Sequence, residues 1–399
     1  MELKSTKADH SCMTIQPNKE AIQFAFIGDL FLGGEYISFA EKSGINMLEP
    51  FRNVHHLTTD ADILVVNLEG PIYTGPNKRP DVSSVLFNHP DAIKYLLNHR
   101  ECVVNLANNH IMDYGEEGLL RTIAILDQNN IKYVGAGRNY EKANQELILY
   151  LKNKKIAFVA YTSDENHIGA IIANKNTAGC ATYLDLDTAV GKIRSLKNRV
   201  DTVCVLLHWG HEYYQYPSPD QVNLAHALVD AGADFIIGHH PHVIQGIENY
   251  KRSLILYSTG NFFFPNYKSQ SGRIQYQKPM TKEFIIIFSI LCEDGSISYA
   301  YIGGLIDDRK HMLEIFKGNE QDAFEKKMIM LSNAISDIRY DTLWSDYKKK
   351  RDKELAREST HEAFYKLKKT PVIDLIKDLT FEDIKRNIVR IVRIVTKTK

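Results

Sequence analysis

Short runs of β-branched and other apolar residues recur along most of the chain, and each run stops abruptly at polar or glycine-rich residues. They span residues 22–27, 63–66, 102–104, 156–160, 203–207, 235–237 and 254–257. Continuous apolar runs of this length are typical of strands buried on both faces. Helical patterns fill the intervals at 91–98, 115–129 and 220–231. The alternation predicts an α/β fold in which helices cover buried sheets.

The composition is that of an ordinary globular protein, and it narrows the classes of partner. Of 399 residues, 44% are hydrophobic and 25% are charged, which excludes a wholly disordered or coiled-coil chain. Lys plus Arg number 49 and Asp plus Glu number 49, so the formal net charge is zero and we expect no nucleic-acid partner. Residues 1–20 lack the apolar stretch of a signal peptide, and the cysteines are scattered without a C-x-x-C motif. We therefore expect a cytoplasmic protein.

Changes in pattern divide the chain into three parts. Residues 1–20 are polar, and we expect them to form a flexible N-terminal segment. Residues 21–305 hold the apolar runs and end in an expected β-hairpin over 282–302, with Glu293-Asp294-Gly295 at its turn. Residues 306–399 consist of charged helical stretches and are expected to form a helical C-terminal region.

The last of these helical stretches is amphipathic and basic. Ile384, Ile388, Ile391 and Val395 repeat at helical spacing, while lysines and arginines occupy the other faces. Such a helix can lie on an anionic membrane surface. It can also pack its apolar stripe against the domain, which is the commoner arrangement. Peripheral membrane contact and packing within the protein therefore both stand as interpretations.

Residue types that bind metals follow the predicted strands at the point where each strand ends. They are Asp29, Glu69, Asn109 with His110, His208, and the pair His240 and His242. Ligands of open α/β sheets bind beyond the carboxyl ends of the strands. Carboxylate, amide and imidazole groups together suit Mn, Fe or Zn, and a shared carboxylate would hold two ions ~3.5–4 Å apart. Singly each residue could be a turn or cap residue, but the joint pattern predicts a site for two divalent metal ions.

The strand-end residues belong to an ordered series of motifs. The series is Gly28-Asp29, Asn67-Leu68-Glu69-Gly70-Pro71-Ile72, Ala107-Asn108-Asn109-His110-Ile111-Met112-Asp113-Tyr114-Gly115, His208-Trp209-Gly210-His211-Glu212-Tyr213, Gly238-His239-His240-Pro241-His242-Val243 and Ser258-Thr259-Gly260-Asn261-Phe262. Over residues 22–303 the chain thereby resembles the CapA proteins of poly-γ-glutamate capsule synthesis, a family of the calcineurin-like metallophosphoesterase superfamily. The resemblance implies a four-layer α-β-β-α sandwich with a two-metal site between the strand-end loops. A helical C-terminal appendage would follow it.

The same resemblance implies roles for individual residues. The implied metal ligands are Asp29 on the first ion, Glu69 as the bridge, Asn109 and His208 on the second ion, and His240 and His242, one on each ion. His110 matches the histidine that protonates the leaving group or stabilises the phosphoryl oxygens. Asp113 could orient His110, because histidines of metal sites usually need an acceptor on their other nitrogen.

Two positions depart from the wider superfamily. The first motif elsewhere reads Asp-x-His, whereas this chain has Phe31, so one nitrogen ligand is missing unless His239 or Glu35 replaces it. A glutamate, Glu69, stands where most phosphoesterases have aspartate. Both departures are usual among CapA proteins. Glu212 and Asn261 are further candidates for the site.

The resemblance implies a dimetal hydrolase, of the phosphoesterase type, in capsule or poly-γ-glutamate biosynthesis. Its substrate would be an anionic small molecule or polymer, and its partners would be other capsule-synthesis proteins. Arg273 and Lys278 are candidates for a basic substrate-binding rim, against the alternative of a solvated loop. Two other interpretations stay open: a non-catalytic, metal-binding assembly or polymer-binding protein, and an enzyme that cleaves or transfers a γ-glutamyl amide.

Overall fold

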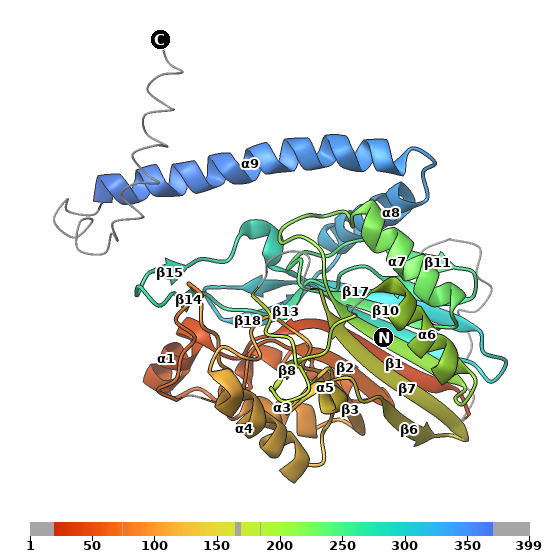
Figure 1. Cartoon of the computed structure of the whole chain (residues 1–399). Helices are drawn as coiled ribbons and strands as arrows, with labels where there is room; N and C mark the ends of the chain where they lie inside the picture. Colours follow the sequence, from red (N-terminus) through yellow and green to blue (C-terminus); the bar gives the residue numbers. More distant parts are fainter. Residues whose placement is uncertain (1–19, 74, 164–168, 184, 370–399) are drawn as a thin grey trace. The chain divides into compact units, whose positions relative to one another are not determined.

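A computed structural model describes residues 20–73, 75–163, 169–183 and 185–369 of the chain (Figure 1). One compact unit ends at Asp341, and a second unit begins at Thr342. The second unit contains most of one long helix, α9 (Tyr340–Lys369). All the strands belong to the first unit.

The larger sheet combines a parallel half with an antiparallel half. Its order is β18-β17-β16-β1-β2-β3-β4, and β13 pairs with the end of β1. The bounds are β1 (Ile22–Leu30), β2 (Ile63–Leu68), β3 (Glu101–Asn105), β4 (Lys132–Val134), β13 (Asn261–Phe263), β16 (Glu283–Leu291), β17 (Ile297–Asp307) and β18 (Met312–Ile315). Strands β1 to β4 run parallel, and β16 joins β1 in antiparallel register. The predicted hairpin over 282–302 is therefore confirmed as β16 and β17, and it extends the sheet beyond β1.

The second sheet has the order β11-β12-β10-β9-β7-β6. Its bounds are β6 (Leu147–Leu151), β7 (Lys154–Thr162), β9 (Thr202–His208), β10 (Phe235–His239), β11 (Ile247–Tyr250) and β12 (Ser253–Leu256). Two short ribbons lie apart from both sheets: β5 (Ala136–Gly137) with β8 (Gly179–Cys180), and β14 (Tyr267–Lys268) with β15 (Ile274–Gln275). Each apolar run of the sequence forms a strand of one of the two sheets, as predicted.

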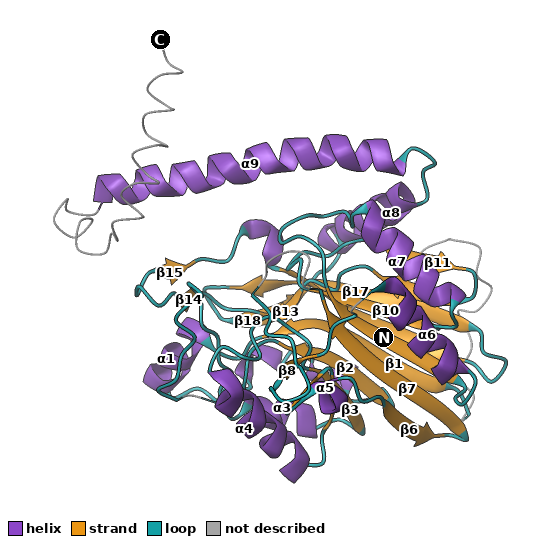
Figure 2. Ribbon diagram, viewed as in Figure 1, coloured by secondary structure: helices purple, strands orange, loops and turns teal. Residues whose placement is uncertain are grey.

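The two sheets pack face to face, with helices on their outer faces (Figure 2). Along β1, Phe24 and Phe26 enter the core between the sheets, whereas Ala25 and Ile27 enter a core beneath helices, since successive strand residues point to opposite faces. The helices over the larger sheet are α1 (Gly34–Ser43), α2 (His55–Thr58), α3 (Ala92–Leu97) and α4 (Gly115–Gln128), with the 3₁₀ turn η1 (Glu49–Phe51). On the second sheet, α6 (Leu186–Lys197) packs on β9 and α7 (Pro219–Asp230) on β10. This is the four-layer α-β-β-α sandwich expected from the sequence.

Two motif glycines sit where strand backbones approach too closely for a side chain. A Cβ on Gly28 would lie 2.0 Å from the Gly260 carbonyl oxygen, and one on Gly238 would lie 1.9 Å from the Tyr257 carbonyl oxygen. Each glycine directly precedes a strand-end residue of the predicted site, Asp29 or His239. The close approach therefore requires glycine at both positions, next to residues of the predicted site.

The compact unit continues past the boundary that the sequence predicted at residue 305. Strand β17 runs to Asp307, β18 pairs with it, and α8 (Asn319–Ile335) follows. Helix α8 buries Phe324, Met328 and Leu331 in the core between the sheets. The compact unit therefore ends at Asp341. The sequence did not indicate this end because the charged composition of the stretch obscures its narrow apolar stripe.

Three further elements complete the described secondary structure, namely α5 (Tyr140–Ala143), η2 (Pro279–Thr281) and the part of α9 in the second unit. No helix in the described part of the chain combines the length and apolar character needed to cross a membrane. Apart from Glu20, the predicted N-terminal segment 1–20 lies outside the described residues, as does the basic amphipathic stretch over 384–395.

Candidate metal centre

Strand register brings several polar side chains to one edge of the larger sheet. Asp29 lies opposite Asn67 on β2 and opposite Asn261 on β13, and Asn67 in turn lies opposite Asn105 on β3. The Asn67 amide donates a hydrogen bond of 2.9 Å to Asp29 Oδ1 and approaches Glu69 Oε2 at 3.5 Å. Parallel strands thus fix the spacing of the two buried carboxylates. Sequence reasoning missed Asn67, although it lies near the end of β2, two residues before Glu69.

Two groups of potential ligands meet at this edge. Asp29, Glu69 and His208 each offer an atom within 4.8 Å of the others, and all three are buried. Glu212, His240 and His242 form the second group under the same criterion, with Glu212 exposed and both histidines buried. Asn109 adjoins the first group, because its Oδ1 lies 2.9 Å from His208 Nε2. All six ligands implied by the resemblance therefore lie together, but their metal-binding roles stay predictions.

His242 links the two groups. Its Nδ1 lies 2.9 Å from Asn261 Oδ1 and 3.3 Å from Asp29 Oδ2, while its Nε2 lies 3.6 Å from Glu69 Oε1. Donation from Nδ1–H to Asn261 would leave Nε2 to bind a metal ion once it loses its proton, which is the arrangement of a metal-binding imidazole held by a neighbouring acceptor. Asn261 in turn donates to the Thr281 carbonyl, so its orientation is fixed.

The donor set fits divalent ions. Both ring nitrogens of His240 are buried without a hydrogen-bond partner among the described residues, and so is Glu69 Oε1. Unpartnered buried polar atoms are costly unless an ion or water satisfies them. Two ligand atoms on one ion lie ~3.0–3.4 Å apart for bonds of ~2.1 Å. The separations of Asn109 from His208 (2.9 Å) and of Glu69 from His242 (3.6 Å) are close to that range.

The electrostatics of the cluster favour added positive charge. Burial raises the pKa of Glu69 to about 8, and the nearby charge of Asp29 adds to this rise while His242 opposes it. Burial would lower the pKa of His242, but Glu69 and Asp29 together raise it to about 10. By contrast, burial and neighbouring imidazoles hold the pKa of His208 well below its usual value and lower that of His240 to about 4. Neutral imidazoles beside carboxylates are in the form that binds metal.

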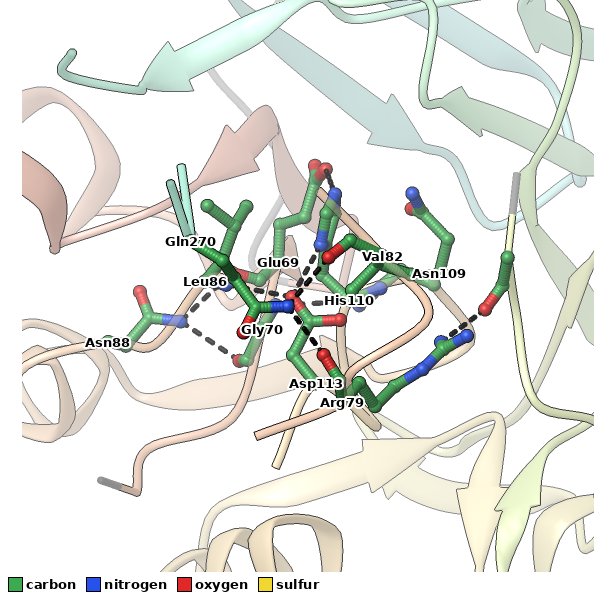
Figure 3. Close-up of polar contacts among 12 residues, drawn as sticks. Glu69, Gly70, Arg79, Val82, Leu86, Asn88, Asn109, His110, Asp113 and Gln270 are labelled. Atoms are coloured by element: carbon green, nitrogen blue, oxygen red, sulfur yellow. Dashed lines mark hydrogen bonds and ion pairs between the residues drawn. The ribbon is translucent and has the colours of Figure 1, made fainter. Parts of the chain in front are cut away.

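His110 stands beside the carboxylates with a partner of its own (Figure 3). Its Nδ1 lies 2.6 Å from Asp113 Oδ2, and its Nε2 lies 4.0 Å from Glu69 Oε1. Asp113 is buried, and its Oδ2 also accepts the Leu86 backbone N–H at 2.7 Å. Burial lowers the pKa of His110, but the charge and hydrogen bond of Asp113 outweigh this and leave that pKa raised. The pair can therefore present a proton on Nε2 toward the centre, and the predicted role of Asp113 in orienting His110 stays a prediction.

Side chains outside the predicted site brace the loop that carries Glu69 (Figure 3). Asn88 donates to the Glu69 and Gly70 carbonyl oxygens at 3.0 and 2.9 Å. Gln270, from the β14–β15 turn, donates to the Arg79 and Val82 carbonyl oxygens at 2.6 Å each. No sequence motif pointed to Asn88 or Gln270, because each acts on backbone far away in the chain.

Comparison with known proteins identifies the family. A sequence-family model, described as bacterial capsule synthesis protein PGA_cap, matches residues 23–266, which is more than half of the chain. The chain belongs to the PGA_cap family.

Curated relatives agree with this assignment. Over 252 residues the chain is 32% identical to the capsule biosynthesis protein CapA of Bacillus anthracis, covering 61% of this chain and 60% of the relative. Over 246 residues it is 33% identical to the PGA biosynthesis protein CapA of Bacillus subtilis, covering 61% of this chain and 64% of the relative. The chain thus spans less than two thirds of the length of these relatives. Among solved structures, an NAD nucleotidase of Haemophilus influenzae matches with a TM-score of 0.38 and 14% identity, covering 84% of this chain and 60% of that one. A similarity of that size does not bear on activity.

The remaining predicted residues of this PGA_cap protein are spread around the centre. His239 is buried with its Nε2 3.4 Å from the Ile27 carbonyl oxygen, so that nitrogen faces strand backbone. Glu35 lies in the first turn of α1, where its charge acts on His311, and it joins neither ligand group. Lys278 places its ammonium 4.5 Å from the centre of the Tyr213 ring, which lies 6.4 Å from the His242 ring. Arg273 is exposed, and its side chain makes no hydrogen bond or ion pair with any described residue.

Proposed function

We propose that this PGA_cap protein is a metal-dependent hydrolase of the phosphoester type, acting in capsule or poly-γ-glutamate metabolism. The observation that carries the proposal is the meeting of two ligand groups around Glu69, with the buried His240 ring unpartnered among the described residues. A scaffold would gain no stability from burying such groups unsatisfied. Mn, Fe or Zn would suit the mixture of oxygen and nitrogen donors.

The chain's own residues would divide the work as follows. Asp29, Glu69, Asn109, His208, His240 and His242 would hold the ions, which would supply an activated water and neutralise the anionic oxygens of the substrate. His110 would donate the proton on its Nε2 to the leaving oxygen. Asp113 would keep the proton on Nδ1 and fix the ring, because its Oδ2 is itself held by the Leu86 N–H.

The substrate would be anionic. The curated relatives are named for capsule and PGA biosynthesis, and we extend that setting to this chain as part of the proposal. Lys278, stacked over Tyr213 near His242, supports binding of an anionic group at the rim of the centre. Capsule-synthesis proteins would then be its partners.

One observation favours a second candidate function. Phe31 occupies the first-motif position where catalytic relatives of the wider superfamily carry a histidine, and its ring packs against Phe264 and Tyr267. A protein that keeps metal for shape but has lost turnover would serve as an assembly or polymer-binding component. His110 with Asp113 argues for catalysis, since a scaffold has no need of a leaving-group acid.

The test combines metal analysis with hydrolysis assays. Purified protein is expected to bind divalent metal and to hydrolyse p-nitrophenyl phosphate or bis(p-nitrophenyl) phosphate when Mn is added. His110→Ala should keep the metal and lose about 10²–10⁴ in kcat. His56→Ala, which removes an exposed histidine on α2, is the matched control and should behave as the wild type. Metal binding without turnover would favour the assembly role, and a protein that binds no metal and ignores Mn would refute both.

A further inference from the structure

We propose that Glu212 is a metal ligand, and that beside His240 and His242 it supplies a solvent-facing carboxylate to the centre that Asp29, Glu69 and His208 line from the buried side. The inference rests on the proposed function, since it concerns the same metal centre. Its starting point is the second ligand group, in which one carboxylate oxygen of Glu212 and one nitrogen of each histidine lie within 4.8 Å of one another.

Backbone hydrogen bonds hold Glu212 in place beside the histidines. The loop after β9 donates from Trp209 N to the His239 carbonyl at 3.0 Å and from Tyr213 N to the Pro241 carbonyl at 2.8 Å. Glu212 lies between these two bonds, so the loop that carries it is joined on both sides to the segment that carries His240 and His242. Backbone structure therefore keeps Glu212 next to the two histidines, within reach of its side chain.

The histidine segment also has the marks of a ligand-bearing loop. His240 and His242 adopt φ values of +96° and +57°, in the left-handed region that residues with a Cβ rarely occupy. Such backbone strain persists where surrounding structure enforces it, and it concentrates at functional sites. His240 is only 1% exposed, and neither of its ring nitrogens has a hydrogen-bond partner among the described residues. The Glu212 carboxylate lies beside this ring.

Glu212 compensates for the nitrogen ligand that the first motif lacks. Phe31 belongs to a small apolar cluster with Leu86 and Phe264, and Phe264 packs edge-on against His242 at 5.0 Å. Apolar rings therefore occupy the side of the centre on which the missing histidine would be expected. Glu212 approaches His242 from the β9 loop instead, and supplies an oxygen ligand in place of that nitrogen.

The two ligand groups differ in access, and one carboxylate would connect them. Asp29, Glu69 and His208 are each 0% exposed, whereas Glu212 is exposed. Glu69 Oε1 lies 3.6 Å from His242 Nε2, so Glu69 can bridge from the buried group to the outer one. The ion bound by Glu212 would exchange more readily and would be the one that meets the anionic substrate. Three carboxylates against two divalent ions would leave a net positive centre suited to such a substrate.

The experiment is a Mn titration of the whole chain, stripped of metal, comparing wild type with Glu212→Gln. Bound Mn is counted by elemental analysis after gel filtration, and electron paramagnetic resonance distinguishes a coupled Mn pair from an isolated ion. Glu141→Gln, which removes an exposed carboxylate at the first turn of α5, is the matched control. Wild type and control are expected to bind about two ions as a coupled pair, and Glu212→Gln about one, with the spectrum of isolated Mn.

Unfolding temperatures of the metal-free proteins should be similar, because glutamine keeps the shape of the Glu212 side chain and can still accept from Tyr213. Mn should raise the unfolding temperature of Glu212→Gln less than that of the wild type. A Glu212→Gln variant that binds two ions with wild-type affinity would overturn the inference and leave the proposed function standing. Wild-type protein that binds no Mn would instead refute the proposed function itself.

Discussion

Asp113→Asn is the substitution that best separates the chemistry of His110 from the shape of the centre. Asparagine is nearly isosteric with aspartate, and its amide oxygen can still accept from both the Leu86 N–H and His110 Nδ1–H. The amide nitrogen would take the place of Asp113 Oδ1, which has no hydrogen-bond partner among the described residues. The change therefore removes the negative charge while both accepted hydrogen bonds can remain.

The magnitude follows from the contact that changes. A hydrogen bond to a charged acceptor contributes roughly 1.5–3 kcal/mol and a neutral one roughly 0.5–1.5 kcal/mol, so about 1–2 kcal/mol is lost at His110. That loss corresponds to a decrease in kcat of about 5- to 30-fold. Burial lowers the pKa of His110, but the charge of Asp113 raises it by more, so the pKa lies above its usual value. Removing the charge must then lower that pKa, so the protonated form is lost at lower pH and the alkaline limb of the kcat profile moves down.

The assay is kcat for bis(p-nitrophenyl) phosphate hydrolysis across pH with saturating Mn, alongside the metal content of each preparation. His110→Ala sets the lower limit of activity, and Asp113→Asn should lie between that variant and the wild type with unchanged metal. A wild-type kcat and pH profile in Asp113→Asn would refute the idea that Asp113 orients and charges His110. A matching loss of metal and activity would show that Asp113 supports the fold of the centre instead.

Three further predictions concern stability and substrate binding. Glu146→Gln should destabilise the protein by about 1–2 kcal/mol at pH 7 after allowance for solvent screening. Burial raises the pKa of Glu146, but Lys192 and Arg199 outweigh burial and lower this pKa to about 2. In urea unfolding, the difference in stability between this variant and the wild type should therefore shrink as pH falls from 4.5 towards 2. Leu331→Ala should cost about 2–5 kcal/mol of unfolding free energy, because this α8 side chain is fully buried between the sheets; a cost near zero would show that α8 does not belong to the core. Lys278→Ala should raise KM by up to about 5-fold with kcat unchanged, whereas Arg273→Ala should leave both constants unchanged. If the two variants changed KM equally, the placement of Lys278 at the rim would be contradicted.

The sequence by itself determined the strands and the residue types at their ends. Apolar runs of three to six residues indicate burial on both faces, and that signal is local, so β1, β2, β9 and β10 begin within a residue or so of the predicted positions. The motif glycines were visible for the same reason, although only the structure explains them, through the approach of Gly28 to Gly260. Residue type then restricts the chemistry, because carboxylates and imidazoles at adjacent strand ends suit few ligands other than metal ions.

Only the tertiary structure decided which of these residues meet. Glu35 was predicted as a possible replacement ligand and Glu212 as a further candidate for the site, yet Glu35 lies on α1 near His311, whereas Glu212 lies beside His240. The end of the compact unit at Asp341 likewise depended on long-range packing of α8. In each case the deciding quantity is a contact between segments far apart in the chain. Strand register and loop-to-loop hydrogen bonds set such contacts, and local periodicity carries no information about them.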